Sequence, residues 1–102
     1  MKIQINGNIN EYYVQTLCML FFPGVKFSKD SADDALSAEV SVTDFGEGAA
    51  ATVTLKTEKG TATCTHSEPK SIGTKVSAEQ IACGKAFFEA GKKLTGMTPS
   101  WG

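Results

Sequence analysis

The chain of 102 residues is 41% hydrophobic and 21% charged, a composition that is ordinary for one small globular domain with its own core. Ten basic and eleven acidic residues give a formal net charge of −1, without a basic stripe or an acidic tail. This gives no electrostatic reason to expect nucleic acid or a membrane surface as a partner. The longest apolar run has six residues, whereas a membrane span needs about twenty, so we expect a soluble, cytoplasmic protein.

The beginning of the chain predicts a strand followed by a helix. Residues 2–6 alternate polar and apolar side chains, as a short strand does. From residue 9 to residue 22 apolar side chains recur at three- and four-residue spacing, which predicts a buried helix. Either Asn8 or Asn10 suits its N-cap, and Pro23 ends it.

Residues 25–28 predict a second short strand, and residues 29–34 a polar loop. Three aspartates in that loop invite a calcium interpretation, but the order D-x-D-x-D-G with a distal glutamate is missing. We therefore expect a solvated loop.

Three strands with strict alternation follow between residues 36 and 66, separated by a turn at 45–48 and a glycine-containing hairpin at 58–60. Their other face is rich in threonine. The pattern predicts an antiparallel meander with one apolar face, against which helices pack. The positions of the apolar face are Leu36, Ala38, Val40, Val42, Ala51, Val53, Leu55, Ala62, Cys64 and His66.

A second helix is well marked near the end of the chain. Ser77 and Gln80 have the spacing of a capping box, and Gly96 suits the C-terminal cap. Gly84 and Gly91 lie seven residues apart within it, so we expect both to face the sheet and to let the backbone approach closely.

These patterns together predict an α+β fold. We expect a two-layer sandwich of order β-α-β-β-β-β-α, with a mostly antiparallel sheet and two helices on one face. A ferredoxin-like arrangement is the alternative, although a meander of three strands suits it poorly. The segment 67–76 reads as a loop whose residue types specify no ligand.

The residue types offer little chemistry. Cys18, Cys64 and Cys83 are widely spaced, without a C-x-x-C pair, and each lies in an apolar pattern, which is typical of buried free thiols. Cys64 and His66 share one strand face, but a metal site needs further ligands and a nucleophile pair needs an orienting third group. A metal- or thiol-dependent enzyme at Cys64 stays a minor alternative, and we assign no catalytic, cofactor-binding or metal-binding residue.

The ending of the chain is more specific. Residues 94–102 read Leu-Thr-Gly-Met-Thr-Pro-Ser-Trp-Gly. This segment resembles the end of the N-terminal domain in HemZ-type radical-SAM enzymes, the oxygen-independent coproporphyrinogen III dehydrogenase (oxidase) family of Gram-positive bacteria. In that family a helix ends in Thr-Gly, and a Trp-Gly pair a few residues later leads into a Leu-Thr-Gly-Ile-Arg-Pro-like segment and the barrel. The opening strand, the aromatic-rich first helix and the alternating strands fit the same layout.

The resemblance implies that residues 1–96 form one accessory domain and that 97–102 begin a linker to a downstream radical-SAM domain. Such enzymes bind a 4Fe–4S cluster through Cys-x-x-x-Cys-x-x-Cys and cleave S-adenosylmethionine reductively, in a step of haem (porphyrin) synthesis. The cysteines of this chain do not match that motif, so the resemblance places cluster and cofactor beyond Gly102. The parent protein would be the oxidoreductase, and this domain would help cover the substrate opening or dock a partner.

A function of another class stays open. The chain is then a free-standing small module that binds a protein or a nucleic acid without enzymatic activity. An RRM-like nucleic-acid surface needs aromatic side chains on the open strands, and the open face predicted here is rich in threonine instead.

Overall fold

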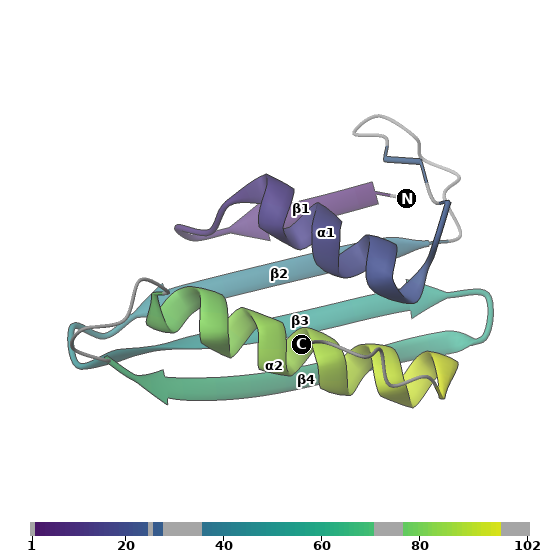
Figure 1. Ribbon diagram of the computed structural model, residues 1–102. Coiled ribbons are helices and arrows are strands. Elements are labelled where there is room, and N and C mark those ends of the chain that lie inside the picture. The colour runs from purple at the N-terminus through teal and green to yellow at the C-terminus, as the bar shows by residue number, and fades with distance from the viewer. Residues whose placement is uncertain (1, 25, 28–35, 71–76, 97–102) are drawn as a thin grey trace.

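Two helices lie side by side on one face of a four-stranded sheet (Figure 1). The computed structural model describes residues 2–24, 26–27, 36–70 and 77–96. The elements are β1 (Lys2–Asn6), α1 (Glu11–Phe21), β2 (Ser37–Asp44), β3 (Gly48–Thr57), β4 (Gly60–Pro69) and α2 (Ala78–Thr95). The predicted α+β class, with a mostly antiparallel sheet and both helices on one face, is confirmed.

The order of strands in the sheet is β1-β2-β3-β4. β2, β3 and β4 form the predicted antiparallel meander, in which Val40 lies opposite Val53 and Val53 lies opposite Cys64. β1 pairs with β2 in parallel, with Ile3 opposite Ala38, and α1 makes the connection that two parallel neighbours require. This order differs from the β-α-β-β-α-β order of a ferredoxin-like domain.

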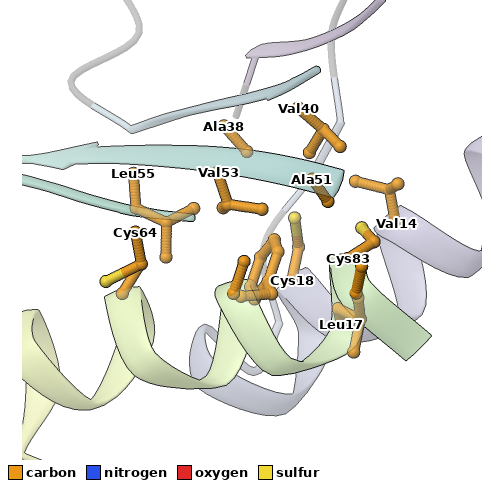
Figure 2. Close-up of a cluster of buried hydrophobic side chains, with 14 of the residues drawn as sticks. Val14, Leu17, Cys18, Ala38, Val40, Ala51, Val53, Leu55, Cys64 and Cys83 are labelled. Atoms are coloured by element: carbon orange, nitrogen blue, oxygen red, sulfur yellow. The ribbon is translucent and has the colours of Figure 1, made fainter. Parts of the chain in front are cut away.

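The core lies between the sheet and the helices (Figure 2). Alternation in the strands points one set of side chains at the helices, and these are the buried ones. Among the described residues, Phe87 of α2 is the largest side chain that is fully buried, followed by Leu17 of α1 and Leu55 of β3. Among the described residues no polar or charged residue is buried, so burial of apolar surface is the main stabilising term here.

Local signals fix the ends of both helices as the sequence predicts. The Asn10 side chain accepts a hydrogen bond from the Tyr12 backbone N–H at 2.8 Å, so Asn10 and not Asn8 is the N-cap of α1. Ser77 Oγ accepts from the Gln80 N–H at 3.2 Å at the start of α2. Gly96 ends α2 with a left-handed backbone, φ 70°.

The two helix glycines face α1 and not the sheet, contrary to the sequence-based expectation. A Cβ atom added at Gly84 would lie 2.7 Å from Tyr13 Oη, and one added at Gly91 would lie 2.6 Å from the ring of Phe21. Tyr13 Oη also donates a hydrogen bond to the Gln80 carbonyl oxygen at 3.0 Å. The close approach that glycine permits here is therefore between the two helices.

Two boundaries differ from the prediction. Lys26 and Phe27 lie in no strand, and the other residues of the predicted strand at 25–28 lie outside the described part of the chain. β4 continues through Pro69, so the first three residues of the predicted loop at 67–76 belong to the sheet. They do so because β3 extends back to Gly48, which pairs with Pro69.

Candidate functional site

An open apolar pocket lies where the C-terminal ends of both helices meet the β3–β4 hairpin. Its volume is about 530 Å³, in the range of small-molecule and cofactor pockets. The residues that line it are Phe21, Phe22, Leu36, Thr57, Glu58, Lys59, Leu94 and Thr95. Four of these residues are aromatic or aliphatic, and the hairpin contributes Thr57, Glu58 and Lys59. The pocket is suited to an apolar group that carries one polar atom.

A cluster of three phenylalanine rings supports one wall of the pocket. The ring of Phe21 packs edge-on against Phe88, with centroids 5.5 Å apart and an interplanar angle of 68°. It also contacts the ring of Phe87 at 5.9 Å. Such edge and tilted contacts are the favourable geometries for aromatic pairs. Because Phe21 is only 2% exposed, the wall that it forms is held rigidly.

A polar group of three side chains lies elsewhere, between β4 and α2. His66 Nε2 lies 3.1 Å from Glu89 Oε1. The hydrogen bond from His66 is the main reason why the pKa of the Glu89 carboxyl lies below its ordinary value, and a hydrogen bond from the Cys64 thiol lowers this pKa further. Sequence reasoning joined Cys64 and His66 and missed Glu89, because no spacing in the sequence shows which helix residue lies above a strand position.

Side chains of this group connect β4 with α2. The contact of 3.1 Å between His66 Nε2 and Glu89 Oε1 joins the strand to the helix. Cys64 is also only 5% exposed. Lys85 and Glu68 form an ion pair between the same two elements. Both pairs fix α2 along the outer strand.

Within the described ranges, no three His, Cys, Asp or Glu side chains gather closely enough to hold a metal ion. The aspartates of the predicted loop at 29–34 lie outside these ranges. The same is true of residues 71–76 of the predicted ligand loop and of residues 97–102 of the predicted linker.

The other two cysteines lie between the helices and the sheet (Figure 2). Cys18 of α1 and Cys83 of α2 are both 0% exposed. Burial raises the pKa of the Cys18 thiol to about 12 and that of the Cys83 thiol to about 11. Thiols with raised pKa values are poor nucleophiles at neutral pH, so both act as small apolar core side chains.

We expect these buried thiols to resist a thiol reagent in the folded protein at neutral pH and to react in denaturant, where all three cysteines titrate. In the folded protein the pKa values of Cys18 and Cys83 lie above the ordinary thiol value of 9.0, so the contribution of these two groups to stability is complete below pH 9.0. It is lost as the pH rises toward 11 and 12. Urea unfolding measured from neutral to alkaline pH checks this loss of stability. Cys18→Ala is the control for the thiol titration, because only two thiols react in its denatured chain. Rapid labelling of Cys18 or Cys83 at neutral pH would contradict it.

The face of the sheet opposite the helices carries a ladder of threonines. Thr52 Oγ1 lies 3.0 Å from Thr65 Oγ1, and Thr54 Oγ1 lies 3.1 Å from Thr63 Oγ1. Cross-strand hydroxyl pairs of this kind stabilise neighbouring strands. The described strand positions of this face include no aromatic side chain, so the face lacks a platform for stacking bases.

Comparison of the chain with models of protein families, with curated proteins and with solved structures gives no match. Neither of the two described helices has the length and apolar character that a membrane-crossing helix requires.

Proposed function

We propose that this chain is a non-catalytic N-terminal domain of a HemZ-like radical-SAM protein, a coproporphyrinogen III oxidase of anaerobic haem synthesis. The observation that carries the proposal is the segment 94–102, Leu-Thr-Gly-Met-Thr-Pro-Ser-Trp-Gly, which resembles the end of that domain. Its first two residues, Leu94 and Thr95, close α2, and Gly96 turns the backbone out of the helix. The matching segment therefore begins in the last turn of α2.

The side chains of the described part agree with an accessory role. Cys18 and Cys83 are buried with raised pKa values, and Cys64 is also buried, so all three thiols lie in the core. In the proposed protein, the 4Fe–4S cluster and S-adenosylmethionine belong to the downstream domain. The part played by this domain is to help cover the substrate opening of that domain or to dock a partner.

The coding sequence beyond Gly102 tests the proposal directly. We expect a Cys-x-x-x-Cys-x-x-Cys motif in the same reading frame, and a stop codon after Gly102 would overturn the proposal. The accessory role has a test of its own in the longer protein, namely deletion of residues 1–95. Loss of turnover or of assembly supports the role, whereas normal turnover and assembly contradict it. Phe45→Ala, an exposed substitution, controls for unspecific effects.

A small protein-binding module is the second candidate, and the open apolar pocket favours it. A pocket of about 530 Å³ at the surface can take an apolar side chain of a partner. A nucleic acid is less favoured, because the open sheet face carries threonine hydroxyls and little charge. The isolated chain is used to capture a binding protein, and a Leu94→Ser variant is then added as a competitor. A variant that fails to compete indicates binding at the pocket, whereas a variant that competes indicates binding elsewhere.

A further inference from the structure

β1 is an outer strand of the sheet, and in the described part of the chain it pairs with β2 alone (Figure 1). The Lys2 N–H donates to the Leu36 carbonyl oxygen at 3.1 Å, so the backbone of Lys2 points toward β2. The N–H and C=O groups of successive strand residues point alternately to the two sides of the strand. The backbone groups of Ile3 and Ile5 therefore point to the outer edge, where they are available to a further strand.

An open hollow lies beside this edge, between β1 and the start of α1. Its volume is about 400 Å³. Ile3 lies opposite the buried Ala38, and the side chain of Ile3 therefore faces the helix layer. Ile5 does the same opposite Val40. Both isoleucines are only partly buried, as is Ile9. The residues that line the hollow are Lys2, Ile3, Gln4, Ile5, Ile9 and Glu11.

We propose that β1 pairs in antiparallel with β1 of a second copy of this chain, about a two-fold axis at Gln4. Ile3 of each copy then lies opposite Ile5 of the other, and Gln4 lies opposite Gln4. Opposite residues in an antiparallel pair alternate between those that exchange two hydrogen bonds and those that exchange none. The outward backbone groups of Ile3 and Ile5 suit the first kind, and Gln4, whose backbone points to β2, suits the second. About four backbone hydrogen bonds then join the two sheets.

The side chains of β1 are complementary to themselves in this register. On the helix side, the isoleucines of both copies come together beside the two hollows, which removes apolar surface from water. On the other side Lys2 lies opposite Asn6, so no two like charges are directly opposite each other. A formal net charge of −1 on each chain adds little repulsion. A closed pair of this kind has the commonest symmetry of homo-oligomers.

A second copy is favoured over an unrelated peptide, because Lys2–Asn6 is symmetric in residue type about its central Gln4. The opposite outer strand, β4, is less suited. Its side chains Ala62 and Cys64 are only 7% and 5% exposed, so a further strand there would bury little apolar surface. The inference goes beyond the proposed function, because it concerns the pairing of this domain and holds whether or not a radical-SAM domain follows.

The experiment measures the mass of the 102-residue chain by sedimentation equilibrium as its concentration is raised. We expect the mass to rise from one copy toward two. Gln4→Glu and Gln4→Lys each place like charges across the axis at an exposed position, so each variant alone should associate severalfold more weakly. The glutamate variant should be the weaker one, because Glu39 lies beside Gln4 on β2. An equimolar mixture of both variants brings opposite charges together and should restore association.

Thr65→Glu and Thr65→Lys are the matched control pair, at an exposed position of β4 on the same face of the sheet, and should leave association unchanged. Circular dichroism establishes that every variant is folded. Hydrogen exchange gives a second measurement. Protection of the Ile3 and Ile5 amides should rise with the concentration of the chain, and that of the Gln4 amide should rise less.

Four results would overturn the proposal. The first is the mass of one copy at every concentration. The second is assembly that continues beyond two copies. The third is association that the Thr65 pair weakens and the Gln4 pair does not, which means that β4 is the contact. The fourth is a mixture of the Gln4 variants that associates no better than either alone, which means that the register is different. The reading frame beyond Gly102 has no influence on these results, so this proposal and the proposed function fail independently.

Discussion

Phe87→Ala is expected to lower the free energy of unfolding by about 3–5 kcal/mol, the usual cost of removing a buried phenylalanine ring. Phe87 is the largest fully buried side chain, and its ring contacts Phe21 at a centroid distance of 5.9 Å. It lies on the face of α2 that covers β3 and β4. Neighbouring side chains belong to several elements, so they close the resulting cavity only in part.

A loss of this size removes much of the stability of a small domain, which is about 5–15 kcal/mol. Urea unfolding followed by circular dichroism measures it, and the slope with denaturant shows whether the folded state stays compact. Phe45→Ala is the matched control, because Phe45 is exposed and its loss should change stability by less than about 0.5 kcal/mol. Equal effects of the two substitutions would contradict the burial of Phe87.

Gly91→Ala is expected to destabilise the protein by about 1–2 kcal/mol, although alanine is the better helix former. The added Cβ would lie 2.6–2.7 Å from three atoms of the Phe21 ring. This ring is buried and packed against Phe87 and Phe88, so it cannot turn away without disturbing the core. Overpacking of this kind costs about 1–3 kcal/mol, which exceeds the gain of about 1 kcal/mol in helix propensity.

Gly84→Ala provides the matched comparison on the same helix face. Here the added Cβ meets only the end of the Tyr13 side chain, with Oη at 2.7 Å. Displacing it weakens one hydrogen bond to Gln80, worth about 0.5–1.5 kcal/mol, and the gain in helix propensity offsets this loss. We expect a change close to zero. Thermal unfolding resolves the difference, since 1 kcal/mol corresponds to roughly 4–8 °C in Tm for a domain of this size. A larger loss at Gly84 than at Gly91 would show that the helices cross differently.

The fold was largely predictable because its signals are local. Alternation of Val53 and Leu55 with threonines identifies a half-buried strand, and Ser77 and Gly96 mark both ends of a helix. The sequence also showed that Gly84 and Gly91 lie on one face of that helix. It did not show which neighbour the face meets, because that depends on where α1 crosses, a contact between residues far apart in the chain.

The candidate sites were less predictable for the same reason. Glu89 meets His66 only after α2 has been laid along β4, and its position in the helix is that of an ordinary exposed residue. The pocket gathers Phe22, Leu36, Lys59 and Leu94 from four separate parts of the chain. Each of these residues has an unremarkable local pattern, so the cavity exists only at the level of the assembled fold.

The order of strands predicts that some parts of the domain unfold locally more easily than others. β3 is central and is covered by α2, whereas β1 is an edge strand of five residues bound to a single neighbour in parallel. Parallel pairs are slightly weaker per residue, and closing this one requires the ends of a long intervening segment to meet. Local unfolding therefore begins at β1, and backbone amides there exchange with solvent sooner than those of Val53 and its neighbours. The meander with α2 forms the persistent unit, and the first strand with α1 is the part that separates from it at least cost.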